Sequence, residues 1–379
     1  MTETENWQSA AEQALRTLWG EAITCTITDT FREQGRNRVY RLAVENGPVA
    51  SVILKASLGD DENPYVVGDD APRSAFSRFC NEWAGCEVLG PLGLGPVAYT
   101  GDPERGFYLM EDLGADAQSL ADRLTGSDPT AAEAALFAYA RSLGALHAAT
   151  QESAAQWDAL RTARGGAPPK PSVPGEFQSE VAKFGELAER YGVVLPESFV
   201  SELARIGVVV ESPGDYLAFS PTDCCPDNHV LRGERVVFFD CEGARMRHAL
   251  LDAAYLLAPF PTCWCTSKLP EGLPERLLAG YREHFPGGDD FEEQLTLVLA
   301  GWVLLTLTWD WAGNWEEEDH TWGLVTLRQR HLHRLENLLA RPPLVALLPG
   351  VAQVAAELYG ILKTRWADLE PMPLYPAFR

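Results

Sequence analysis

The pattern of apolar and polar residues divides the chain into a β-rich first third and a mostly helical remainder. Residues 8–19 repeat apolar positions at helical spacing, and Gly20 ends that pattern. Short stretches with the character of strands follow at 23–31, 38–44, 49–56, 97–100 and 106–110, with one helical stretch at 73–89 among them. The pair Asn46-Gly47 before the third stretch is a strong hairpin signal. These patterns predict a small strand lobe that contains one internal helix.

Beyond residue 112 the pattern changes to long helical stretches. Apolar periodicity predicts helices over 131–150, 176–191, 196–206, 250–257, 273–283, 291–311, 321–340 and 351–367. Two short strands, 216–219 and 236–240, flank a polar loop, and the Gly- and Pro-rich segment 165–174 indicates a linker or insertion. We therefore expect an α+β fold with two lobes. The N-lobe would span residues 1–112 and the C-lobe residues 113–379, with a hinge near 111–114.

Charge restricts the partners that this chain can have. The 379 residues include 54 acidic side chains and 31 Lys and Arg, which gives a formal net charge of −23. Binding to nucleic acid or to an anionic membrane surface needs clustered cations, so we expect neither partner. The N-terminus is acidic, and the longest uncharged run, Leu295–Trp309, is shorter than the roughly 20 residues that span a bilayer. A cytoplasmic location is therefore predicted.

One polar segment, residues 216–243, carries the side chains best suited to chemistry. Asp223 and Asn228 lie five residues apart in a loop, and Asp240 ends the strand pair that follows. Phosphoryl transfer needs a carboxylate that takes the proton of the acceptor, and oxygen ligands for Mg²⁺ on the phosphates. Asp223 is thus the candidate base, and Asn228 and Asp240 are candidate metal ligands. An ordinary turn rich in Asp and Asn would explain these residues if they stood alone.

The N-terminal third supplies partners for this segment. Lys55, one of five lysines, ends an apolar strand and is expected to contact phosphates, and Glu82 on the next helix is expected to hold that lysine. The turn at Gly35 and Asn37 would present backbone N–H groups to phosphates. Glu111 and Leu113, in the predicted hinge, would contact the base of a nucleotide.

The order of these motifs resembles the protein-kinase-like fold, in its aminoglycoside phosphotransferase and choline kinase branch. The resemblance covers roughly residues 20–260 and rests on four segments: Asn-Arg-Val-Tyr-Arg-Leu at 37–42, Leu-Met-Glu-Asp-Leu at 109–113, Leu-Gly-Ala-Leu-His-Ala at 143–148 and Asp-Cys-Glu-Gly-Ala-Arg at 240–245. It implies transfer of the γ-phosphoryl group of Mg²⁺-ATP to a hydroxyl of a small molecule. By the same resemblance, Asp223 is the catalytic base, Asn228 and Asp240 bind Mg²⁺, and Lys55 binds the phosphates.

Two departures from the family pattern lie next to the candidate base. Pro221-Thr222 stands where the family commonly has His-Gly, and Cys225 replaces the usual His between the Asp and the Pro. The geometry of the acceptor side is therefore expected to differ. His147 lies on an apolar helix face and is interpreted as a packed core histidine.

The cysteines do not form a recognisable framework. All eight are spread along a chain of middle length, which favours free thiols in a reducing cytoplasm. The spacings Cys224-Cys225 and Cys263-x-Cys265 are poor matches for a structural zinc site, so small buried thiols are the preferred interpretation. Since some cysteines adjoin the candidate base, oxidation or alkylation there is expected to inhibit.

The acceptor is expected to bind near a segment rich in tryptophan. Residues 302–322 contain five tryptophans and the acidic run 316–319. Aromatic faces with carboxylates suit an amine-bearing acceptor through cation–π contacts, and a sugar stacked on tryptophan is the alternative. The candidate contacts are Trp311, Trp315, Glu316 and Glu317; a buried helix face followed by a solvated acidic loop would also explain this segment.

A second class of function is a kinase-like nucleotide-binding or scaffold protein that transfers no phosphoryl group. The missing His-Gly before Asp223 favours that alternative. The presence of Asp223, Asn228, Asp240 and Lys55 together argues against it.

Overall fold

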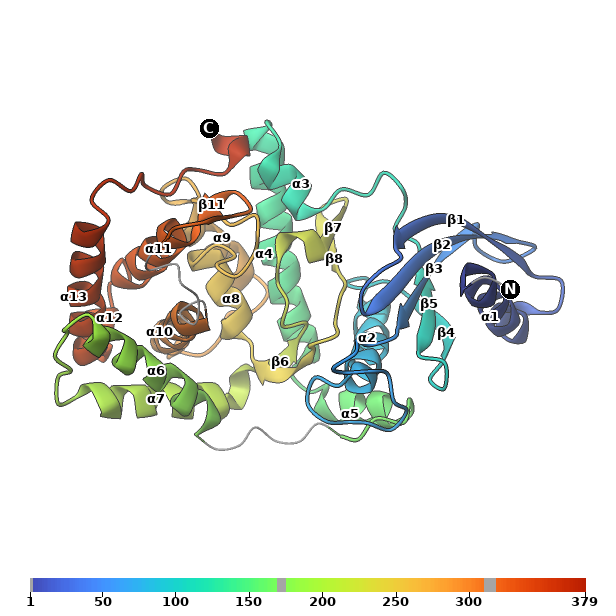
Figure 1. The fold of residues 1–379 in the computed structure, drawn as a ribbon, viewed down its shortest axis with the longest axis horizontal. Helices are drawn as coiled ribbons and strands as arrows, with labels where there is room; N and C mark the ends of the chain where they lie inside the picture. Colours follow the sequence, from blue (N-terminus) through green and yellow to red (C-terminus); the bar gives the residue numbers. More distant parts are fainter. Residues whose placement is uncertain (1–2, 169–174, 310–317) are drawn as a thin grey trace.

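A computed structural model of the chain describes residues 3–168, 175–309 and 318–379. A sheet with two flanking helices forms one end of the molecule, and helices form the rest (Figure 1). The predicted α+β class, with a small β-rich N-lobe and a mainly helical C-lobe, is confirmed. Strand β5 ends at Glu111 and the next helix begins at Leu120, so the predicted boundary between 112 and 113 falls in their connection.

The N-lobe is an antiparallel sheet with the strand order β1-β2-β3-β5-β4. Its elements are α1 (Glu3–Trp19), β1 (Thr24–Arg32), β2 (Asn37–Glu45), β3 (Ser51–Ser57), α2 (Ala75–Leu89), β4 (Ala98–Asp102) and β5 (Phe107–Glu111). Asn46 has φ of 59°, which the predicted Asn-Gly turn between β2 and β3 requires. All five predicted strands and both predicted helices of this lobe are present.

Successive side chains along a strand point to opposite faces of the sheet, and the two faces contact different helices. Side chains of β3 at 52, 54 and 56 share a buried cluster with Ala11 and Leu15 of α1. The opposite face carries Tyr108, which packs with Phe79 and Trp83 of α2. Lys55 is paired with Tyr108 in register and therefore lies on the α2 face, among buried side chains.

The C-lobe is built from eleven helices among the described residues, with short strands between them. The helices are α3 (Leu120–Thr125), α4 (Pro129–Thr150), α5 (Ala154–Thr162), α6 (Glu176–Arg190), α7 (Phe199–Glu211), α8 (Leu250–Leu257), α9 (Leu273–Arg282), α10 (Phe291–Trp309), α11 (Leu327–Leu339), α12 (Leu344–Leu347) and, closing the set, α13 (Pro349–Arg365). The strand pairs are β6 (Leu217–Ser220) with β9 (Arg245–His248), β7 (His229–Arg232) with β8 (Arg235–Phe238), and β10 (Thr321–Trp322) with β11 (Val325–Thr326).

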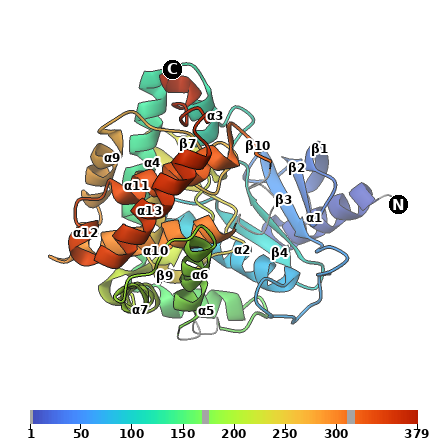
Figure 2. The same ribbon diagram turned by 60° about the vertical axis from the view of Figure 1, so that its left-hand side comes forward.

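Helix α10 is the apolar centre of this lobe. Among the described residues it alone is long and apolar enough to cross a membrane, and 78% of its most apolar window is buried inside the protein. The helices α6 and α7 lie beside it in both views (Figures 1 and 2). A Cβ at Gly301 would lie 2.7 Å from Ile206 and 2.9 Å from Phe177, so a glycine permits this close approach. The predicted helices that follow the segment 165–174 are thus present as α6 and α7, and both contribute to the core.

Some elements differ from the predicted ones. The pattern did not indicate α3, α5, α12 or β9, all of which are short. The predicted helix over 321–340 begins at Leu327, because residues 321–326 form the β10-β11 hairpin and Gly323 turns with φ of 69°. The last two residues of the predicted helix 291–311 lie outside the described residues.

Candidate active site

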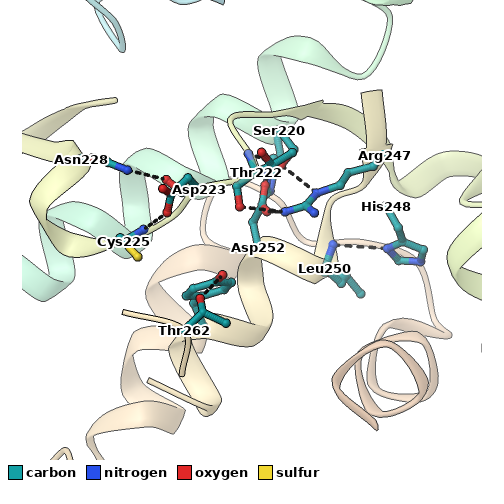
Figure 3. Close-up of polar contacts among 12 residues, drawn as sticks. Ser220, Thr222, Asp223, Cys225, Asn228, Arg247, His248, Leu250, Asp252 and Thr262 are labelled. Carbon is teal, nitrogen blue, oxygen red and sulfur yellow. Dashed lines mark hydrogen bonds and ion pairs between the residues drawn. The ribbon is translucent and has the colours of Figure 1, made fainter. Parts of the chain in front are cut away.

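The candidate base and one candidate metal ligand come from a tight loop between β6 and β7. Asp223 accepts a hydrogen bond on Oδ1 from the backbone N–H of Cys225 at 3.2 Å, and its carbonyl accepts one from Asn228 Nδ2 at 3.4 Å (Figure 3). The N–H of Phe239 donates to the carbonyl of Asn228 at 3.2 Å, which brings residue 228 beside Asp240. The structure therefore gathers Asp223, Asn228 and Asp240 into one region, as the sequence predicted.

A lysine from the N-lobe completes this region. Lys55 Nζ lies 2.7 Å from Asp240 Oδ1 and 3.0 Å from Glu82 Oε2. Strand β3 supplies the lysine, α2 supplies Glu82, and the segment after β8 supplies Asp240. The predicted pairing of Lys55 with Glu82 is thus present, and Lys55 also contacts the predicted metal ligand.

Lys55, Asp240 and Glu82 lie together and largely out of contact with water, so each of them shifts the pKa values of the other two. Burial alone would lower the pKa of Lys55, but the carboxylates of Asp240 and Glu82 outweigh burial and hold that pKa above its ordinary value. Burial also acts to raise the pKa of Asp240, but Lys55 outweighs it and the pKa is lowered. Burial raises the pKa of Glu82 in spite of Lys55. Lys55 and Asp240 are therefore an ion pair at neutral pH.

The carboxyl group of Asp223 has a different environment. Its pKa is raised, first because the surrounding protein partly shields this exposed group from water and then because the negative charges of Asp240 and Asp227 are near; the hydrogen bond from Cys225 acts in the opposite direction. A raised pKa makes a carboxylate a stronger base, which suits a group that takes a proton from a hydroxyl.

The loop that carries Asp223 rests on a buried network that the sequence analysis did not find. Arg247 Nε donates to Ser220 Oγ at 2.8 Å, its guanidinium contacts the carbonyl of Thr222 at 3.5 Å, and it pairs with Asp252 (Figure 3). Ser220 Oγ in turn accepts from the N–H of Thr222, whose φ is 68°. Arg247 reaches this position because β9 pairs with β6, and the short strand β9 gave no periodic signal.

Asp252 also contacts a histidine of helix α4. His147 Nε2 lies 3.2 Å from Asp252 Oδ2, and His147 Nδ1 lies 2.8 Å from the hydroxyl of Tyr281. The interpretation of His147 as a packed core histidine is confirmed, since it is fully buried. Burial acts to raise the pKa of Asp252, but Arg247 and His147 outweigh burial, so that pKa is lowered.

The turn between β1 and β2 contacts the metal-site segment through a residue that the prediction passed over. The guanidinium of Arg36 pairs with Glu242, two residues after Asp240. Asn81 of α2 donates to the carbonyl of Glu242 at 2.9 Å. Gly35 has φ of 79° in this turn, and Asn37 is buried at the start of β2. Contact of Gly35 and Asn37 with a nucleotide stays a prediction.

The predicted hinge is held by ion pairs on both sides. Glu111 pairs with Arg232 of β7 at 2.8 Å. Asp112 accepts from Arg41 at 2.7 Å and from Ser51 at 2.7 Å. Glu111 is the last residue of β5 and Leu113 follows in the connection to α3, and their contact with the base of a nucleotide stays a prediction.

Two loops beside Asp223 are joined by a disulfide. Cys225 bonds to Cys263, and the other six cysteines are free and buried. The expectation of free thiols was therefore wrong for these two residues. Positions 38 apart in the sequence meet only because residues 221–228, which we call the catalytic loop since they carry the candidate base, pack against the segment after α8. The preference for buried thiols holds for the rest.

No protein-family model matches the chain, and no curated protein matches it. Among solved structures it is similar to a choline kinase from Streptococcus pneumoniae, with 16% identity over 82% of this chain and 93% of that one and a TM-score of 0.44. A choline/ethanolamine kinase family protein from Mesorhizobium loti has 17% identity, 86% and 92% coverage and a TM-score of 0.45. An aminoglycoside phosphotransferase from Alicyclobacillus acidocaldarius has 12% identity, 90% and 93% coverage and a TM-score of 0.44.

The structural neighbours are small-molecule kinases of one kinase-like family. They are the kinds of protein that the sequence motifs resemble.

The donor set at Asn228 and Asp240 fits Mg²⁺. No group of three or more His, Cys, Asp or Glu side chains in residues 3–168, 175–309 and 318–379 is arranged to hold a metal. Mg²⁺ is commonly bound through one or two carboxylates together with water and substrate phosphates, so an ionised Asp240 and the amide oxygen of Asn228 suffice. His229 is not expected to add a ligand, because its ring is fully buried and packs on Tyr139 and Phe238.

The predicted acceptor contacts Trp311, Trp315, Glu316 and Glu317 lie outside the described residues. Among the described residues, three tryptophans are exposed: Trp264, Trp309 and Trp322. Trp264 is the one that contacts the catalytic loop, since its Nε1 donates to Asp227 Oδ2 at 2.9 Å. Sequence reasoning passed over Trp264, because no local pattern relates it to Asp227.

Proposed function

We propose that this chain is an ATP- and Mg²⁺-dependent small-molecule kinase that transfers the γ-phosphoryl group to a hydroxyl. The observation that carries the proposal is the contact of Lys55 with both Glu82 and Asp240, in a region that also holds Asn228 and Asp223. A lysine held by a helix carboxylate, a metal-binding Asp with an Asn beside it, and a nearby Asp base are the parts that phosphoryl transfer needs. The sequence motifs that resemble the kinase-like family at 37–42, 109–113 and 143–148, which lie outside these residues, support the same chemistry.

Each residue has a separate task in this proposal. Lys55 neutralises phosphate charge, and Asn228 and Asp240 hold Mg²⁺, which offsets the charge that develops on the transferred group. Asp223 accepts the hydroxyl hydrogen of the acceptor in a hydrogen bond, orients its oxygen and takes its proton. Arg247, through Ser220 and Thr222, positions the loop that carries Asp223.

The proposed acceptor is an amine-bearing or sugar-like hydroxyl compound, such as an amino sugar, an aminoglycoside or a choline-like alcohol. Asp223 and Asp227 are exposed carboxyl groups on the catalytic loop, and the exposed ring of Trp264 lies against Asp227. Carboxylates beside an aromatic face favour a cationic group on the acceptor. Neutral sugars and homoserine-like alcohols are the alternatives, and nucleic acid and membrane surfaces are not proposed as partners.

Two measurements in sequence test the proposal. A thermal-shift titration with Mg²⁺-ATP and with Mg²⁺-GTP reports nucleotide binding, since a ligand at 100 times its Kd stabilises by about 2.7 kcal/mol. An ATP-consumption screen over aminoglycosides, amino sugars, choline-like alcohols, neutral sugars and homoserine then reports transfer. Turnover with at least one acceptor, lost in Asp223→Asn, supports the kinase.

The same two measurements distinguish a kinase from a kinase-like protein that binds nucleotide without transferring a phosphoryl group. Stabilisation by nucleotide without consumption on any acceptor would favour a kinase-like binding or scaffold protein. If neither ATP nor GTP stabilises the protein, both the kinase function and the nucleotide-binding function are contradicted.

A further inference from the structure

Two loops on the acceptor side of Asp223 are joined covalently. Cys225, two residues after Asp223, is bonded to Cys263 in the segment that follows α8, and their Cα atoms lie 5.5 Å apart. Cys225 is partly exposed, whereas Cys263 is buried. The bond therefore connects the catalytic loop to a part of the C-lobe that is remote in sequence.

A hydrogen bond next to the disulfide also joins the catalytic loop to the segment after α8. Trp264, next to Cys263, donates from Nε1 to Asp227, which lies two residues after Cys225. Trp264 is 39% exposed. The disulfide and the hydrogen bond thus act as two adjacent links, and they place an exposed aromatic ring beside the loop that carries Asp223.

The segment behind Trp264 is fixed to the helical lobe. Arg330 of α11 donates to the carbonyls of Cys263 at 2.6 Å and Trp264 at 3.2 Å, and to the carbonyl of Trp322 at 2.6 Å. A Cβ at Gly323 would lie 1.8 Å from the carbonyl oxygen of Trp264, so the β10-β11 hairpin packs directly on this segment. Residues 263–264 are therefore fixed to the helical lobe, and the disulfide and the hydrogen bond attach the catalytic loop to them.

We propose that the Cys225–Cys263 disulfide is a positioning element that holds the catalytic loop against the Trp264 segment, and that a dithiol reductant weakens phosphoryl transfer by opening it. The proposal rests on the proposed kinase function. Reduction leaves Lys55 with its partners Glu82 and Asp240, because those contacts come from other elements. The expected loss is therefore on the acceptor side and not in nucleotide binding.

The opening step is an ordinary thiol–disulfide exchange. A thiolate of the dithiol attacks Sγ of Cys225, the more exposed sulfur, to form a mixed disulfide and release Cys263 as a thiolate. The second thiol of the reductant then closes its own ring and releases Cys225. Two electrons pass to the protein, the reductant becomes a cyclic disulfide, and its two protons end on Cys225 and Cys263.

The first test establishes the bond and its effect on structure without any activity. Alkylation of the denatured chain should label six cysteines before treatment with dithiothreitol and all eight after it. Hydrogen exchange of the folded chain should speed up on reduction at residues 222–229. Labelling of eight cysteines without reductant, or exchange there that reduction does not change, would overturn the positioning role even if no acceptor is found.

The second test uses the acceptor found by the activity screen. On reduction, kcat/KM for the acceptor should fall about tenfold or more, since small misplacements of reacting groups are costly, while the KM for ATP stays constant. Cys225→Ser and Cys263→Ser should match the reduced protein and lose their response to dithiothreitol. Cys25→Ala, which removes a buried free thiol of β1, is the control and should respond like the unmodified chain. An equal fall in Cys25→Ala without reductant, or no fall on reduction, would contradict the proposal.

Discussion

Lys55 Nζ and Asp240 Oδ1 are 2.7 Å apart and form an ion pair between the N-lobe and the C-lobe. The lysine that is proposed to meet phosphates is therefore already in contact with the aspartate that is proposed to bind the metal. Binding of Mg²⁺-ATP would give each of these groups a new partner of opposite charge. The nucleotide therefore enters a site in which the lysine is already paired with carboxyl groups.

Lys55→Met should abolish most nucleotide-dependent activity. The substitution removes the cation from the phosphates and leaves Glu82 and Asp240 near each other without it. We expect kcat/KM for ATP to fall by about 10²–10³, the usual effect of removing one such electrostatic contact. Steady-state kinetics with ATP as the varied substrate measure this. Lys183→Met, at a partly exposed lysine of α6, is the control; an equal fall in that variant would mean that the loss does not come from the site.

Asp223→Asn should separate transfer from nucleotide binding. Asparagine has nearly the same shape but cannot take a proton, so we expect kcat to fall by about 10²–10⁴, the contribution typical of general base catalysis. The thermal shift with Mg²⁺-ATP should be preserved. Asp368→Asn, at an exposed carboxyl group near the C-terminus, is the matched control. Turnover in Asp223→Asn close to that of the unmodified chain would remove Asp223 from the mechanism.

The acid limb of the pH–rate profile should lie above the range of an ordinary aspartate. Asp223 works as a base only when it is unprotonated, so activity falls as pH falls through its pKa, and that pKa is raised by burial, Asp240 and Asp227. Asp227→Asn removes one negative neighbour but keeps an acceptor for Trp264. We expect that variant to move the acid limb of kcat/KM for the acceptor to lower pH. A limb that stays in place would show that Asp223 does not set it.

Asp252→Asn should destabilise the C-lobe. The substitution leaves Arg247 charged and largely buried without its carboxylate, and breaking a buried pair from one side costs about 3–5 kcal/mol. The folded-state pKa of Asp252 is lowered, so its stabilising contribution is fully present above the pKa of the unfolded chain and is lost as pH falls through the folded value. Urea unfolding at pH 7 and near pH 3 measures both effects. The difference between the unmodified chain and Asp252→Asn should be smaller at the lower pH.

Local sequence signals were sufficient for the N-lobe. Strands β3 and β5 are strongly apolar, turn residues separate the strands, and Asn46 occupies the left-handed position that its turn requires. Lys55 and Glu82 could be paired in advance because one ends an apolar strand and the other lies on the next helix. The residues around Asp223 could be grouped for a similar reason, since a single hairpin separates Asn228 from Asp240.

The support of the catalytic loop could not be predicted in the same way. Arg247 reaches Ser220 only through the pairing of two four-residue strands, which are too short to show a period. The bond between Cys225 and Cys263 depends on the packing of a segment that follows α8, and the spacing of the two cysteines carries no information about it. Residues 321–326 kept a helical pattern in sequence, but Gly323 adopts a positive φ and turns the chain back.

The disulfide also closes part of the chain into a covalent ring. Asn228 and Asp240 lie within the segment between Cys225 and Cys263, whereas Asp223 lies just outside it. A single cut by a protease between residues 226 and 262 would therefore leave both fragments attached to each other under non-reducing conditions. A nicked chain would migrate as one species on a non-reducing gel and as two after reduction, and the proposed metal ligands would stay tethered to the loop of the proposed base.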